Sequence, residues 1–183
     1  MTIKAVILDG ASPGDSFAVD VRRALIEKLR NAGYSVECFV LAELQIAYCL
    51  GDFKCWTRTP GICALDDDNR IVAKAAAQCD LLFFLTPVTF GGYSSNLKKA
   101  VDHLIQNISP FFTKIAGQTH HRKRYSSFPP LVAVGILPHE DKEGEQIFTS
   151  LAERNARNLH SCSETTFVYR YRRPADALQL GWM

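Results

Sequence analysis

The sequence predicts an α/β protein with a doubly wound, five-stranded parallel sheet between two layers of helices, a three-layer sandwich. Short apolar runs alternate with segments of helical periodicity along the chain, as in folds whose right-handed crossovers place helices on both faces of the sheet. The expected strands are apolar over most of their length, which indicates burial on both faces. We expect residues 1–183 to form one domain whose ligand site lies beyond the carboxyl ends of the strands.

Each expected element follows from a local pattern. Residues 3–8 are an apolar run that ends at Asp9, a strand followed by a turn. Ser16 is the expected N-cap of a helix that ends near Gly33, and residues 34–41 alternate as a second strand. The remaining expected elements are a helix over 69–78, a strand from 81 that stops before Pro87, a helix capped by Ser94 or Ser95 with an apolar stripe to Ile105, a strand over 131–137, a helix over 141–159 and a strand near 165–169.

Composition and charge exclude several classes of partner. The chain has 21 Lys and Arg against 19 Asp and Glu, a net charge of +2 that is too small to indicate nucleic-acid or membrane-surface binding. No strongly apolar stretch approaches the roughly 18 residues needed to cross a bilayer. The first residues lack the pattern of a secretory signal, so we expect a cytoplasmic protein. Its six cysteines are then expected to stay reduced.

Three loops lie at the expected ligand edge: residues 9–16, 86–93 and 137–141. The first joins a strand to the start of a helix, where free N–H groups and the helix dipole attract a phosphate. Ser12 and Ser16 supply additional hydroxyl donors. The glycine spacing and the lack of a lysine exclude both the dinucleotide fingerprint and the nucleotide P-loop. A plain strand-to-helix turn remains the alternative.

The second loop is the most informative segment of the chain. It follows a buried strand and places aromatic residues around two glycines, so that backbone can approach a flat ring. Residues 86–105 (TPVTFGGYSSNLKKAVDHLI) closely resemble the flavin-contacting segment of the flavodoxin-like NAD(P)H-dependent FMN reductase family, which includes iron-sulfur flavoproteins. The resemblance extends to residues 117–121, 124–125 and 129–135 and to the cysteine-rich insert, and covers most of the chain up to about residue 140.

This resemblance implies a flavodoxin-like fold that binds FMN noncovalently, with the phosphate in the first loop and the isoalloxazine against the backbone of the second. A third loop beginning at Gly135 would close over the ring, and NAD(P)H would be the substrate. We assign no catalytic residue, because the flavin supplies the chemistry. Packing in the core or at an interface remains the alternative for Phe90 and Tyr93. The expected cofactor-binding residues are Ser12, Gly14, Ser16, Phe17, Pro87, Val88, Thr89, Phe90, Gly91 and Gly135.

The first loop departs from the family's pattern. Relatives usually carry an Asn-Gly-Ser-Pro-Arg type of sequence, whereas residues 9–16 of this chain (DGASPGDS) hold no basic residue. Asp15 also brings a negative charge close to the expected phosphate. Helix N-termini bind phosphates without a cation, so the neutral donors remain the expected site.

The cysteine-rich insert holds Cys49, Cys55 and Cys63. Iron-sulfur flavoproteins bind a four-iron cluster through a CxxCxxC run and a fourth downstream cysteine. Asp52 stands here at the second position, and a hard oxygen suits such a cluster less well than sulfur. The sequence therefore disfavours a cluster, and it also disfavours zinc, whose structural sites usually show two paired knuckles. We expect a redox-inert loop that packs over the flavin site or at a subunit interface.

Residues 107–130 are too long for a simple connection and carry the basic run 120–125. One interpretation is attraction of an NADPH phosphate or of a neighbouring subunit's flavin phosphate, and the other is a solvated basic loop. The histidine pair at 120 and 121 has no further ligand at metal-binding spacing, so no metal site is predicted.

The function that we expect is an FMN-dependent oxidoreductase that passes electrons from NADH or NADPH through FMN to a small acceptor such as a quinone, a flavin or a metal complex. A second subunit would cover the flavin, in a homodimer or a tetramer of dimers. One alternative is a flavodoxin-like electron carrier for a protein partner, which the +2 charge disfavours because such carriers are commonly acidic. Another is a scaffold that has lost cofactor binding, suggested by the altered first loop and Asp52. The sequence decides neither the acceptor nor the choice between NADH and NADPH.

Overall fold

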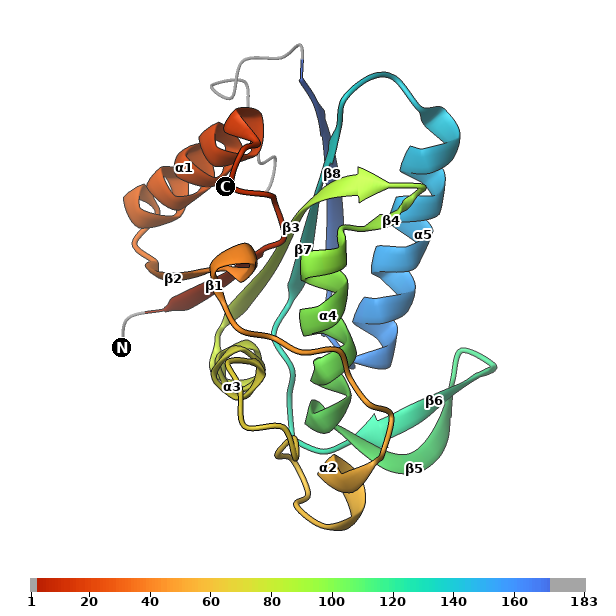
Figure 1. Cartoon of the computed structure of the whole chain (residues 1–183). Helices are drawn as coiled ribbons and strands as arrows, with labels where there is room; N and C mark the ends of the chain where they lie inside the picture. Colours follow the sequence, from red (N-terminus) through yellow and green to blue (C-terminus); the bar gives the residue numbers. More distant parts are fainter. Residues whose placement is uncertain (1–2, 172–183) are drawn as a thin grey trace.

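The computed structural model describes residues 3–171, which form the predicted three-layer sandwich (Figure 1). The parallel strands of the central sheet stand in the order β2-β1-β3-β7-β8, so that the strand order reverses beside β1. This is a doubly wound order, and it confirms the predicted fold class. The strands are β1 (Lys4–Asp9), β2 (Ser35–Val40), β3 (Leu81–Thr89), β7 (Leu131–Leu137) and β8 (Glu164–Arg170).

Helices cover both faces of this sheet. One hydrophobic cluster joins the first helix to one face, and a second cluster joins the three other long helices to the opposite face. The neighbouring residues Phe83 and Phe84 of β3 are fully buried and belong to different clusters, as the alternation of a strand requires. The helices are α1 (Ser16–Asn31), α2 (Lys54–Thr57), α3 (Asn69–Gln78), α4 (Ser95–His103) and α5 (Lys142–Asn158), with 3-10 turns η1 (Leu41–Glu43) and η2 (Leu104–Asn107).

The predicted end of the third strand at Pro87 is wrong. β3 continues to Thr89, because the chain turns back at residues 90–91 and the short strand β4 (Gly92–Tyr93) pairs antiparallel with it. Pro87 itself keeps its place opposite Ile136 of β7. β4 and the turn before it lie against α5.

The basic segment is not the loop that we expected. Residues 108–123 form an antiparallel hairpin of β5 (Ile108–Ile115) and β6 (Gln118–Lys123). Its two-residue turn, Ala116-Gly117, has φ angles of 47° and 78°, which is the geometry that two-residue hairpins favour. The hairpin lies beside α2, at the end of the molecule opposite the β3–β4 turn (Figure 1). Within residues 3–171 no helix is both long and apolar enough to cross a membrane.

Candidate functional site

Three connections meet at the carboxyl edge of the sheet: the β1–α1 loop (residues 10–15), the β3–β4 turn (89–92) and the β7–α5 loop (138–141). They follow neighbouring parallel strands, because β3 pairs with β1 on one side and with β7 on the other. The fold thus brings together the three segments in which the sequence placed a ligand site.

Ser94 joins the first two of these segments. Its hydroxyl donates to the carbonyl oxygen of Gly10 over 2.6 Å and caps α4 by accepting the N–H of Leu97. Its own N–H donates to the Thr86 hydroxyl over 3.0 Å. A methyl group on Gly10 would lie 2.6 Å from both Leu97 Cβ and Ser94 Oγ. The first loop therefore has to carry glycine where it crosses α4.

A buried ion pair holds the end of β1, where the same loop begins. Asp9 is fully buried, and its carboxylate accepts the N–H of Ala11 over 2.9 Å and Nη1 of Arg22 over 2.7 Å. Burial raises the pKa of Asp9, while the bonds from Ala11 and Arg22 act in the opposite direction. The pair anchors the end of β1 to α1 just before the loop begins.

Asp15, and not Ser16, is the N-cap of α1. Its carboxylate accepts the N–H of Ala18 over 3.0 Å, whereas Ser16 is already the first helical residue. The prediction of Ser16 as the cap is wrong because a residue whose side chain can reach the third helical N–H lies one position earlier. Among residues 3–171, the N–H groups of Ser16 and Phe17 and the hydroxyls of Ser12 and Ser16 make no hydrogen bond.

The end of β8 closes against this cap. The hydroxyl of Tyr171 donates to the second carboxylate oxygen of Asp15 over 2.8 Å, and its ring lies 5.0 Å from the ring of Phe17. Burial and the Asp15 carboxylate together raise the pKa of Tyr171 to about 12. These side chains line an open cleft together with Gly14 and Ser16. The cleft therefore lies at the surface between the first loop and the end of β8.

The β3–β4 turn presents backbone and one aromatic ring to solvent. Phe90 has a φ of 50° and a fully exposed side chain, and Gly91 follows with a φ of 71°. Thr89 is exposed as well, while Val88 is buried beneath it. A methyl group on Gly91 would lie 2.6 Å from Ile147 of α5. The turn is thus held closely against α5 at Gly91, while Thr89 and Phe90 are exposed to solvent.

Gly91→Ala is expected to lower the free energy of unfolding by about 2 kcal/mol, because it combines a left-handed φ with an overlap on Ile147. Gly117→Ala is the matched control, since Gly117 has a φ of 78° but no atom within 4 Å of an added methyl group. The control should lose about 1 kcal/mol. Urea unfolding of both variants measures the difference, and equal losses would show that contact with α5 is unimportant.

Most predicted cofactor-binding residues lie at this edge. Ser12, Gly14, Ser16 and Phe17 belong to the first loop and the first turn of α1, and residues 87–91 to the second segment. Gly135 differs, because it lies inside the buried strand β7, where a methyl group would meet Phe148 and Val88. The third loop therefore begins after Leu137 and not at Gly135.

Sequence reasoning missed the residues that hold the loops in place. Arg22, Thr86 and Tyr171 contact them through side chains. Tyr171 is 156 positions from Asp15, so no local pattern could indicate the contact. The Asp9-to-Arg22 spacing likewise has no helical or strand periodicity.

The cysteine-rich insert does not pack over these loops. Cys55 and Cys63 line a cavity with His103, at the end of α4 opposite Ser94. Figure 1 shows α2 and the insert at that far end. In the part of the chain that the structure describes, no group of three or more His, Cys, Asp or Glu side chains is arranged to hold a metal ion.

Known proteins of similar sequence identify the family of this chain. Residues 3–121 match the family model described as NADPH-dependent FMN reductase. An FMN-dependent NADPH-azoreductase of Staphylococcus aureus is 28% identical over 135 residues, which are 74% of this chain and 69% of the relative.

Solved structures share the fold at lower sequence identity. An NAD(P)H:quinone oxidoreductase from Methanothermobacter marburgensis superposes with a TM-score of 0.70 at 17% identity, over 95% of this chain and 87% of its own. An FMN-dependent NADH-azoreductase from Bacillus anthracis, in complex with FMN, superposes with a TM-score of 0.67 at 10% identity, over 97% of this chain and 92% of its own.

The sheet order and the three loops at its carboxyl edge define a protein of the flavodoxin-like fold. The chain belongs to the NADPH-dependent FMN reductase family. It is accordingly an FMN-dependent oxidoreductase that takes electrons from NAD(P)H, as the sequence predicted.

The residues present fit FMN. The first loop and the first turn of α1 offer the hydroxyls of Ser12 and Ser16 and the N–H groups of Ser16 and Phe17, which have no partner among the described residues. They form a donor set for a phosphate. Thr89 and Phe90 are exposed at the end of β3, where a flat ring can lie. Asp15 and Asp20 also line the cleft at the first loop, and the negative charge of a carboxylate disfavours a phosphate there.

Proposed function

We propose that the three loops form the FMN site, and that the enzyme passes electrons to small aromatic acceptors of the azo or quinone class. The free donors at the N-terminus of α1 carry the proposal of the site. The relatives named for azo compounds and quinones support the acceptor class. A one-domain subunit in a homodimer or homotetramer, acting in the cytoplasm, completes the proposal.

The role of the chain's own residues is to bind FMN and to orient its ring. The N–H groups of Ser16 and Phe17 and the hydroxyls of Ser12 and Ser16 hold the phosphate. The backbone of residues 87–91 lies along the flavin ring. Gly135 does not contact the ring; it packs inside the sheet against Val88, which belongs to that backbone segment. FMN, when bound, supplies the chemistry of accepting a hydride and passing on electrons.

The exposed ring of Phe90 supports the proposed oligomer. A fully exposed phenylalanine at the tip of a tightly held turn is typical of a residue that packs against another subunit. A second subunit in this position would cover the outer side of the turn and exclude water from the flavin.

The catalytic proposal is tested by adding FMN, NADPH and an azo dye or a quinone to the purified chain. We expect oxidation of NADPH that requires both FMN and the acceptor. An electron carrier for a protein partner would bind FMN without oxidising NADPH in this assay, and a scaffold would bind no FMN. Either result would contradict the proposal.

Asp15→Asn is expected to tighten FMN binding about tenfold, or about 1.4 kcal/mol, because it removes a negative charge beside the phosphate. Asparagine is as good an N-cap as aspartate, so stability should change little. Riboflavin, which has no phosphate, should bind both proteins equally.

Glu27→Gln is the control for this prediction, since Glu27 is an exposed acidic residue about three turns further along α1 and outside the cleft that Asp15 lines. Quenching of flavin fluorescence measures the affinity of the wild type and of both variants for FMN and for riboflavin. An equal gain for riboflavin, or an equal gain from Glu27→Gln, would place the phosphate elsewhere.

A further inference from the structure

The cysteine-rich insert builds a second site, separate from the flavin loops. Its cavity is lined by three thiols, from Cys49, Cys55 and Cys63, and by His103 and Gln106. It lies at the carboxyl end of α4, whereas the flavin loops contact the amino end of that helix. The chemistry of these thiols does not require a bound flavin.

Cys63 and His103 form a hydrogen-bonded pair with a defined direction. Cys63 Sγ lies 3.7 Å from Nδ1 of the buried His103, and Nε2 of the same ring lies 2.9 Å from the carbonyl oxygen of Ala47. A carbonyl oxygen only accepts, so Nε2 carries the hydrogen. The neutral ring then has its lone pair on Nδ1, which accepts the thiol hydrogen of Cys63.

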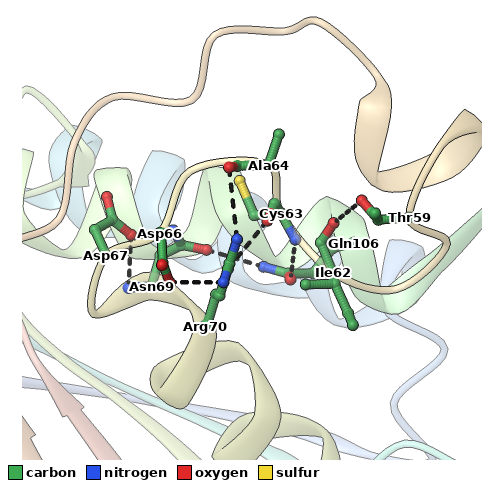
Figure 2. Close-up of polar contacts among 9 residues, drawn as sticks. All are labelled: Thr59, Ile62, Cys63, Ala64, Asp66, Asp67, Asn69, Arg70 and Gln106. Carbon is green, nitrogen blue, oxygen red and sulfur yellow. Dashed lines mark hydrogen bonds and ion pairs between the residues drawn. The ribbon is translucent and has the colours of Figure 1, made fainter.

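The backbone of Cys63 is held from both sides, as Figure 2 shows. Its N–H donates to Gln106 Oε1 over 3.0 Å, and its carbonyl oxygen accepts Nε of Arg70 over 3.1 Å. The Gln106 amide donates in turn to the carbonyl of His103 and to Asn69. The thiol and the base therefore share one rigid support.

The acidic run that ends the insert fixes the imidazole in the same way. Asp67 accepts the N–H of Ala47 over 2.9 Å, and Asp68 accepts the N–H of Gln45 over 2.7 Å. These bonds hold the Ala47 carbonyl against His103. A nucleophile, a base and a group that orients the base are thus aligned, which is the arrangement of an activated thiol.

Cys55 is a suitable second thiol. It is buried beside Cys63 in the same cavity. Burial raises the pKa of the Cys55 thiol, and the neighbouring sulfur of Cys63 acts in the same direction. Cys55 thus stays protonated and reacts slowly with peroxide by itself. It lines the same cavity as Cys63, where it can react with an oxidised Cys63.

We propose that Cys63 and His103 form a reactive thiol pair that hydroperoxides oxidise to a disulfide with Cys55. In the first step Cys63 Sγ attacks the O–O bond and its proton passes to Nδ1 of His103, so that an S–O bond forms as the O–O bond breaks. The leaving oxygen takes up that proton, which releases water or an alcohol and leaves a sulfenic acid. In the second step Cys55 attacks the sulfenic sulfur, the S–S bond forms and water leaves. Two thiols lose two electrons and one hydroperoxide gains them.

The test uses the reduced full chain without flavin or NADPH. It is treated with hydrogen peroxide, alkylated and digested with trypsin. Cleavage after Lys54, Arg58 and Arg70 places Cys55 in residues 55–58 and Cys63 in residues 59–70, so their linked peptide has a distinct mass. We expect this linked peptide, and consumption of Cys63 about tenfold faster than that of the exposed Cys162.

Two variants and one control separate the steps. Cys55→Ser should leave a sulfenic acid at Cys63 that dimedone traps, and His103→Gln should slow Cys63 about tenfold without changing Cys162. His103 is buried, so its variant can fail to fold; the wild-type chain in urea, where the advantage of Cys63 should vanish, tests the same point. Equal rates for Cys63 and Cys162 in the folded protein would overturn the proposal. Linkage to Cys49 instead would overturn the choice of Cys55.

Discussion

Arg22→Met is expected to lower the free energy of unfolding by about 3 kcal/mol at pH 7. The substitution leaves the fully buried carboxylate of Asp9 without the cation that lies 2.7 Å away. Removing one partner of a buried pair is costly, because the remaining charge stays desolvated. The loss should also displace the first loop, since Asp9 holds the N–H of Ala11.

The loss should depend on pH in a defined direction. Burial already raises the pKa of folded Asp9, and removing Arg22 raises it further, because Arg22 lowers it. The folded state then binds more protons than the unfolded state between the unfolded pKa and this raised value, so stability falls as pH rises through that window. At about pH 5 the carboxyl of the variant is increasingly protonated, and the difference from the wild type should be smaller than at pH 7.

Arg23→Met is the matched control, because Arg23 is exposed and pairs with Asp20 on the surface of α1. It should cost less than about 1 kcal/mol at either pH. Urea unfolding at the two pH values measures both variants. A loss for Arg22→Met that is independent of pH would show that the charge of Asp9 is not its cause.

Gly10→Ala is expected to cost about 3 kcal/mol and to abolish tight FMN binding. Its added methyl group would lie 2.6 Å from Leu97 Cβ and Ser94 Oγ and 3.0 Å from the backbone nitrogen of Leu97. Because the backbone of α4 cannot yield as a flexible side chain would, the loop has to move away. That movement breaks the bond from the Ser94 hydroxyl to Gly10 and shifts the donors of Ser12 and Ser16.

Gly14→Ala is the control in the same loop, since no atom lies within 4 Å of its added methyl group. It should unfold like the wild type. Urea unfolding and FMN titration of both variants measure the two effects. Should Gly10→Ala match Gly14→Ala in both, the loop would not depend on its close approach to α4.

Much of the fold could be predicted because its signals are local. The strand over residues 131–137 and the helix over 69–78 were predicted to the residue, since each combines a strong pattern with a clear boundary. The end of β3 and the β5–β6 hairpin were not, because pairing with another segment decides them. Ala116-Gly117 was a usable hairpin signal, but the basic residues around it were interpreted either as a phosphate-attracting segment or as a solvated loop.

The sequence by itself determined the doubly wound fold class and the family, because buried strands and helices depend on neighbouring residues and the segment at 86–105 is recognisable. It also predicted which loops meet at the carboxyl edge of the sheet. Only the tertiary structure decided how those segments are held and what else they do. Arg22 reaches Asp9 from α1, Tyr171 reaches Asp15 from the end of β8, and His103 reaches Cys63 across 40 positions. Each contact joins residues that lie far apart in sequence or on different elements, so only packing brings them together.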